Sequence, residues 1–455
     1  MEVKEVLVIG AGIAGCATAL ALAKRGISVA IATSSADQRV YHGSFIQDEF
    51  LQDDLPKLPE LLHSSLSSPR AVEQLHKLAK KSVHELVSEN YTVDRHGNVD
   101  IHLCLQEQLR NLSNVEWLEH HVLLDLITLE RDSKKIADQH KKPCCLGAWI
   151  YNQQLKQLEP ILAKEVVLAT GGAASLYAYS THPAYTRGEG LGIAARASVR
   201  LIQMNKIEFC PLSLFEENSP AFPLPLELLT EGGRFLLAKN GAHWTPPGKE
   251  VLEKEIFDEL VRSQRRHLWL DLTFGAIASI KEKFPAVDSY CLTRGFNLAK
   301  ELLPVVPAAC YTSGGIAVDG TAQSSMQRLR AVGDMASTGL VYNCKNEALR
   351  VLESLTWAAA CAEEIAKQIG KLVYYFPEIE ERNQLPEMGD SSYEEEWMLM
   401  RQILWYYAGI QTSPKRQQRA LTLLHGLKES QNKTASSIAE IQFRNSLRTA
   451  ILIAS

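Results

Sequence analysis

The sequence predicts an α/β fold that carries two further parts, an inserted α+β capping domain and a C-terminal helical bundle. Three observations support this prediction. A strand, a glycine cluster and a helix pattern open the chain; two later strands also run into glycine, near residues 171 and 333; and apolar residues recur at helical spacing after residue 393. With 455 residues, the chain is long enough for two or three domains of ~100–200 residues.

The opening segment has the order strand, glycine cluster, helix, strand. Apolar runs over 5–9 and 28–32 flank a helix pattern over 16–24. Between the first run and the helix stand Gly10, Ala11, Gly12, Ile13, Ala14 and Gly15. In this context a GxGxxG motif binds a dinucleotide: the first glycine makes the turn, the second admits the pyrophosphate, and the third lets the helix pack on the strand. The segment therefore predicts a Rossmann-like dinucleotide-binding domain.

The end of the second strand departs from the usual rule. An acidic residue normally binds the ribose hydroxyls there, but this chain has Thr33, Ser34 and Ser35. A hydroxyl can still bond to a ribose, so Thr33 and Ser34 are expected at the cofactor.

Two later segments resemble patterns that recur in flavoproteins of this fold, and together they favour FAD over NAD. A buried-strand pattern over 164–168 runs into Ala169, Thr170, Gly171 and Gly172. A second such pattern, over 328–332, ends in Gly333 and Asp334, whose carboxylate is expected on the ribityl or ribose hydroxyls of FAD. No second GxGxxG follows a strand, so electrons are expected to reach the flavin from a small substrate rather than from a bound NAD(P)H.

Changes of pattern along the chain predict the domain limits. We expect a FAD-binding domain at 1–206 and 315–370, a cap at 207–314 and a helical domain at 371–455. Trp405, Tyr406 and Tyr407 are expected in the core of the helical domain. Local patterns also predict helices over 56–91 and 347–368, a strand pair over 111–129 and an exposed loop over 134–143.

Composition narrows the functional classes. The formal net charge of −5 gives no sign of a general affinity for nucleic acid or anionic lipid. The nine cysteines are scattered without CxxC spacing, so a disulfide framework and a metal site are not expected. Neither a secretory signal nor a membrane span of ~20 apolar residues is apparent, and the cytoplasm is the expected compartment.

Several segments carry a resemblance to a known family. They are 8–15, 167–172, 188–194, 228–231, 305–309, 311–315, 338–340 and 401–410. Through them the chain resembles the L-aspartate oxidase family and, more distantly, the flavoprotein subunits of succinate dehydrogenase and fumarate reductase. The resemblance implies FAD-dependent oxidation of L-aspartate to iminoaspartate, the first step of NAD biosynthesis through quinolinate. It also implies a functional link to quinolinate synthase and an electron acceptor that is oxygen, fumarate or quinone.

The resemblance also implies site residues. It adds Ser44, Glu189, Arg350 and Val351 to those expected to hold FAD. It implies a substrate pocket that contains Thr230, Glu231, Lys249 and Lys345. Lys249 is the candidate for a proton-handling cation, provided that burial lowers its pKa.

The implied substrate residues depart from the family pattern. Lys249 and Lys345 stand where the family has arginine, and Cys210 and Cys310 stand where it has histidine. Lysine attracts a carboxylate but does not grip it as a planar fork, and a thiol is a poorer donor than an imidazole. Three functions therefore stay open: aspartate oxidation, oxidation of another small amino or hydroxy acid, and FAD binding without turnover in an interaction or regulatory role.

Overall fold

The computed structural model describes residues 2–34, 45–47, 67–87, 91, 93, 98–217, 219–239, 241–248, 251–341, 347–380, 382, 393–429 and 437–455. Its largest sheet has seven strands in the order β5-β2-β1-β8-β7-β6, with β17 also paired to β8. The strands are β1 (Val3–Ile9), β2 (Val29–Thr33), β5 (Val115–Glu119), β6 (His121–Thr128), β7 (Cys145–Asn152), β8 (Gln157–Leu168) and β17 (Leu329–Ala331).

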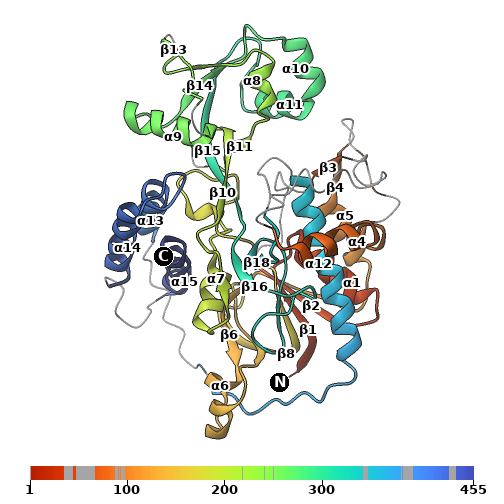
Figure 1. Ribbon diagram of the computed structural model, residues 1–455. Helices are drawn as coiled ribbons and strands as arrows, with labels where there is room; N and C mark the ends of the chain where they lie inside the picture. Colours follow the sequence, from red (N-terminus) through yellow and green to blue (C-terminus); the bar gives the residue numbers. More distant parts are fainter. Residues whose placement is uncertain are drawn as a thin grey trace.

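The central strands run parallel, and both faces of the sheet are covered. Val6 and Val8 of β1 pack among the helices on one face, whereas Leu7 and Ile9 belong to the core on the other face. Such two-sided burial explains why this strand reads as one continuous apolar run. The covering helices on the first face are α1 (Ile13–Ala23), α4 (Pro69–Leu86), α5 (Ile101–Arg110) and α12 (Glu347–Gln368) (Figure 1).

The cap is a second, six-stranded sheet with the order β11-β10-β15-β14-β12-β13. Its longest strands, β10 (Ile207–Leu214) and β15 (Leu303–Thr312), rise from the part that contains the seven-stranded sheet into the upper part of the molecule (Figure 1). The others are β11 (Phe222–Pro223), β12 (Arg234–Leu236), β13 (His243–Trp244) and β14 (Leu268–Asp271). The helices of this region are α8 (Glu227–Thr230), α9 (Leu252–Ser263), α10 (Ile277–Lys283) and α11 (Pro285–Thr293).

The helices at the C-terminal end are α13 (Glu394–Tyr407), α14 (Pro414–Glu429) and α15 (Ile438–Ala454). They pack beside α7 (Glu189–Arg196) (Figure 1). Trp405 is buried, as expected, and contacts the rings of Tyr179, Phe209 and Phe257 edge-on. Tyr406 was expected in the core but is 47% exposed, with its ring 6.5 Å from that of Phe257.

The remaining described strands and α-helices are short. They are β3 (Phe45–Gln47), β4 (Asn98–Asp100), β9 (Leu201–Ile202), β16 (Gly315–Ala317), β18 (Ala336–Ser337) and α6 (Leu129–Asp132).

Two local predictions agree with the structure only in part. The strands expected over 111–129 are present as β5 and β6, but they pair with β2 and β7 rather than with each other. His120 alone connects them in a left-handed conformation (φ +61°), which a histidine tolerates better than a branched residue. The segment 134–143 is exposed as expected except at Asp138, but it contains a 3₁₀ helix over Ile136–His140. Asp138 is buried and accepts a hydrogen bond from Tyr375.

Candidate cofactor site

A cavity of about 540 Å³ lies at the carboxyl ends of β1, β8 and β17, beside the start of α1. Ligands of open α/β sheets bind at this edge. The volume falls within the ~300–1,000 Å³ of cofactor and substrate pockets. Of the residues expected at FAD, the cavity is lined by Gly10, Ala11, Gly12, Ile13, Ala14, Thr33, Ser34, Ala169, Thr170, Gly171, Glu189, Gly333, Asp334, Arg350 and Val351.

The glycine cluster has the shape that a dinucleotide requires. Gly10 has φ +109°, and a Cβ there would lie 2.2 Å from the carbonyl oxygen of Ala169. A Cβ at Gly15 would lie 1.9 Å from the carbonyl oxygen of Gly10, so this residue packs α1 on β1 behind the cavity wall. At Gly12 no described heavy atom lies within 4 Å of such a Cβ. The space above the N-terminus of α1 is therefore free for a pyrophosphate, and these residues fit FAD.

Two other expected residues are not among those that line the cavity in the described part of the chain. Gly172 lies behind the cavity, where a Cβ would be 2.6 Å from Thr312 Oγ1, so it serves close packing. Ser44 lies outside the described residues.

The cavity also contains imidazoles that no sequence motif indicates. His102 of α5 is buried, and its Nε2 lies 2.7 Å from the carbonyl oxygen of Ala11. His182 is buried, its Nε2 lies 3.3 Å from Asp334 Oδ2, and its ring meets Tyr311 edge-on. Both histidines reach the cavity only because distant segments fold together, so local pattern could not identify them.

Glu189 begins α7 and is held by the C-terminal helices. Gln442 of α15 donates to both oxygens of its carboxylate, at 3.4 and 3.3 Å. Burial raises the pKa of Glu189 to about 7. Burial also lowers the pKa of the neighbouring Arg187, whose guanidinium lies 4.3 Å from the ring centroid of Trp397. Residues of α13 and α15 therefore support one side of the cavity.

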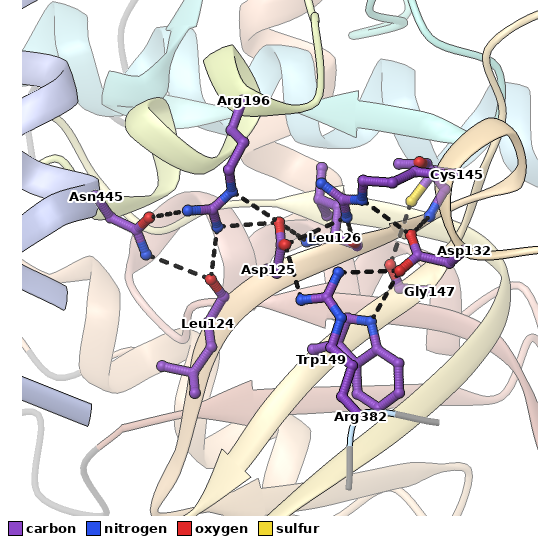
Figure 2. Close-up of polar contacts among 12 residues, drawn as sticks. Leu124, Asp125, Leu126, Asp132, Cys145, Gly147, Trp149, Arg196, Arg382 and Asn445 are labelled. Carbon is purple, nitrogen blue, oxygen red and sulfur yellow. Dashed lines mark hydrogen bonds and ion pairs between the residues drawn. The ribbon is translucent and has the colours of Figure 1, made fainter. Parts of the chain in front are cut away.

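An ionic network holds α7 in place from behind (Figure 2). Arg196 at the end of α7 donates to Asn445 Oδ1 at 2.7 Å and to the carbonyl oxygen of Leu124 at 2.9 Å. It also pairs with Asp125, as do Arg131 and Arg382. Burial opposes ionisation of Asp125, but the three arginines together lower its pKa. The network joins β6, α7 and α15.

Arg350 lies at the start of α12 in the cavity wall. It forms an ion pair with Glu208 of β10 and donates to Ser313 Oγ at 3.0 Å. Its guanidinium lies 4.7 Å from the ring centroid of Tyr311, which also lines the cavity.

The two expected substrate residues that the structure describes, Thr230 and Glu231, do not gather at this cavity. Thr230 ends α8 in the cap, is exposed, and donates to the carbonyl oxygen of Glu227 at 2.8 Å. Glu231 pairs with Lys283 of α10, and the hydrogen bond from that lysine lowers its pKa. Neither residue is part of the cavity lining. Lys249 and Lys345 lie outside the described residues.

The structure also describes both cysteines that stand at family histidine positions, Cys210 and Cys310. The Cys310 thiol is buried and donates to the carbonyl oxygen of Glu208 at 3.3 Å, and Cys210 is partly buried.

Within the described ranges, no group of three or more His, Cys, Asp or Glu side chains is arranged to hold a metal ion. No described helix is long and apolar enough to cross a membrane.

A Rossmann-like sheet, a GxGxxG turn at an open cavity and a cap on two long strands define a class of flavin-binding protein. The chain belongs to the FAD binding domain family, whose profile matches residues 5–44 and 68–345.

Known relatives agree with this class. The L-aspartate oxidase of Vibrio cholerae is 25% identical over 99% of this chain and 92% of its own length. That of Yersinia pestis is 29% identical over 81% and 70%, and that of Halobacterium salinarum is 28% identical over 99% and 93%.

Solved structures show the same fold. Mycobacterium smegmatis Sdh1 in complex with UQ1 superposes with a TM-score of 0.80 at 20% identity, covering 100% of this chain and 86% of that one. A quinol-fumarate reductase with menaquinol molecules gives 0.77 at 18% identity, with coverages of 100% and 90%.

Proposed function

We propose that the chain oxidises L-aspartate to iminoaspartate with FAD, as the first step of NAD biosynthesis through quinolinate. One observation carries the proposal: the L-aspartate oxidase of Vibrio cholerae aligns with 99% of this chain and over 92% of its own length. The bacterial and archaeal relatives share the name across large evolutionary distances, and the GxGxxG cavity supports the cofactor.

Each candidate residue has a proposed role in binding FAD or the substrate. FAD, when bound, supplies the acceptor for the two electrons that leave the amine carbon. Gly12 and the start of α1 receive its pyrophosphate, Thr33 and Ser34 its ribose, and Asp334 its hydroxyl groups. Amine oxidation also releases protons, and Lys249 is the proposed group that handles one of them. Lys345 attracts a substrate carboxylate as a point charge.

The partners follow from the chemistry of the product. The acceptor that reoxidises the flavin is oxygen, fumarate or a quinone. Iminoaspartate hydrolyses readily, so an enzyme of the quinolinate synthase class is the proposed consumer. The cytoplasm is the proposed compartment.

A second candidate is oxidation of another small amino or hydroxy acid. Two contacts favour it: Glu231 forms an ion pair with Lys283, and Thr230 donates a hydrogen bond within its own helix. Because both side chains already have partners in the cap, the substrate pocket would differ from that of the family. The two cysteines at family histidine positions would also leave more room.

A substrate panel separates these functions. Purified, FAD-loaded protein is assayed with L-aspartate, L-glutamate, L-malate and succinate, with oxygen or fumarate as acceptor. Turnover of L-aspartate that falls at least tenfold in Lys249→Ala and Lys345→Ala, but not in the exposed control Lys428→Ala, supports the proposal. Turnover of another acid with aspartate inert replaces it with the second candidate. Inertness toward all four would favour a binding role without turnover.

A further inference from the structure

A buried ion pair joins the start of α12 to the two strands that enter the cap. Arg350 is 8% exposed and is bound by Glu208 of β10 and by Ser313, which directly follows β15. The ring of Tyr311 lies under its guanidinium. Arg350 and Tyr311 line the cavity, whereas Glu208 lies outside that lining. The positive partner of the pair therefore faces the cavity and the negative partner lies behind it.

The same wall contains residues expected at the flavin. Val351 and Ser354, on the first turns of α12, line the cavity together with Gly333 and Asp334. A Cβ at Gly333 would lie 4.0 Å from Ser354 Oγ, so α12 and this turn form one continuous surface. A cofactor that fills the cavity must therefore meet the guanidinium, and the N-terminal end of α12 adds a partial charge of the same sign.

Arg350 is a permanent and immobilised charge. A guanidinium does not lose its proton in proteins, unlike a buried lysine or histidine. Its hydrogen bonds to Glu208 of β10 and to Ser313, just after β15, together with the contact to Tyr311, fix its orientation before any ligand binds. Such a preorganised charge acts most strongly on charge that develops during a reaction, because no reorganisation is needed at that moment.

We propose that Arg350 is the cation that stabilises the negative charge gained by the flavin on reduction, and that Glu208 positions it. The inference rests on the FAD part of the proposed function. Oxidised flavin takes up two electrons and one proton to give an anion, and a second proton gives the neutral reduced form. Arg350 favours the anion, so it raises the reduction potential and limits proton uptake to one.

The test is a reduction-potential titration that needs no substrate. FAD-loaded wild-type protein, Arg350→Gln, Arg350→Lys and Glu208→Gln are reduced anaerobically against reference dyes. Arg350→Gln should lower the equilibrium constant for reduction at least tenfold, which is about 30 mV for a two-electron couple. Arg350→Lys, which keeps the charge, should restore most of this loss. Its midpoint should also fall less steeply with pH than that of Arg350→Gln, since one proton rather than two accompanies the electrons.

Glu208→Gln shifts the potential in the opposite direction. It removes a negative charge behind Arg350 while its amide oxygen can still accept the hydrogen bond, so the potential should rise. This variant carries the test by itself if Arg350→Gln does not fold or does not hold FAD. An unchanged or lower potential in Glu208→Gln would overturn the proposal.

A different role for Arg350 gives a different result. If Arg350→Gln left the potential unchanged but raised the KM for L-aspartate, the residue would anchor a substrate carboxylate and the inference would be wrong. Failure of L-aspartate to reduce the wild-type flavin would refute the proposed substrate alone. The potentials would still be measurable and would decide the role of Arg350.

Discussion

Replacing Gly12 by alanine separates cofactor binding from folding. Gly12 has φ −73°, which alanine adopts without strain, and a Cβ there meets no described atom within 4 Å. Because glycine is the better residue at this helix N-cap, we expect the apoprotein to lose no more than about 1 kcal/mol of unfolding free energy. FAD binding should suffer more. A methyl carbon needs about 3.5 Å to a neighbouring atom, whereas a phosphate oxygen bound to the backbone sits about 2.9 Å from the amide nitrogen.

The cofactor must therefore move away from the turn, and we expect its affinity to fall at least tenfold, about 1.4 kcal/mol. Flavin fluorescence quenching measures the affinity, and denaturant unfolding of the apoprotein measures the stability.

Two glycines provide matched comparisons. Gly10→Ala combines φ +109° with a Cβ only 2.2 Å from the backbone oxygen of Ala169, so it should destabilise the apoprotein by about 2–5 kcal/mol. Gly426→Ala, inside α14 with open space around it, should stabilise by about 0.5–1 kcal/mol and leave FAD affinity unchanged. Two results would refute this reasoning. One is a Gly12→Ala apoprotein that is as unstable as the Gly10→Ala apoprotein, and the other is a Gly12→Ala protein that binds FAD with the wild-type affinity.

Three further results are expected. Burial raises the pKa of Glu189 from 4.5 to about 7, so between these pH values the folded apoprotein binds more protons than the unfolded chain. The free energy of unfolding should therefore fall by at most about 3 kcal/mol as the pH rises from 4.5 to 7. Glu189→Gln should abolish that part of the pH dependence; equal slopes in both proteins would contradict the assignment. Asn445→Ala should cost about 1–3 kcal/mol in chemical denaturation, because it removes two hydrogen bonds of a buried network, one from Arg196 and one to the carbonyl oxygen of Leu124. The exposed control Thr422→Ala should change the stability little. Asp334→Asn should weaken FAD at least tenfold in the same fluorescence titration, and an unchanged affinity would show that this carboxylate does not bind the cofactor.

Local signals in the sequence were sufficient to predict much of the structure around the cofactor cavity. The strand, turn and helix around Gly10 are specified by neighbouring residues, and the helix predicted over 347–368 occupies those residues in the structure. That helix brings Arg350, a residue expected at FAD, into the cavity wall, and its contact with the cofactor stays a prediction. The predicted start of α1 was three residues late, since the helix begins at Ile13 inside the glycine motif.

The residues that were missed depend on tertiary assembly. His102, His182 and Gln442 come from a helix, a loop and the C-terminal bundle, and nothing in their local sequence marks them. Resemblance to a family could carry over the identity of Glu231 but not its partner, and Lys283 holds this carboxylate within the cap. The domain limits and the roles of Lys249 and Lys345 stay predictions.

The central claim is that the flavin of this chain is reduced by L-aspartate. Purified, FAD-loaded protein is mixed anaerobically with L-aspartate while the visible absorption band of oxidised flavin is followed. Loss of the band, saturating with aspartate concentration, is the predicted result and would show electron transfer despite the lysine and cysteine replacements. An unchanged band at high aspartate concentration, with the flavin bound and reducible by dithionite, would contradict the claim.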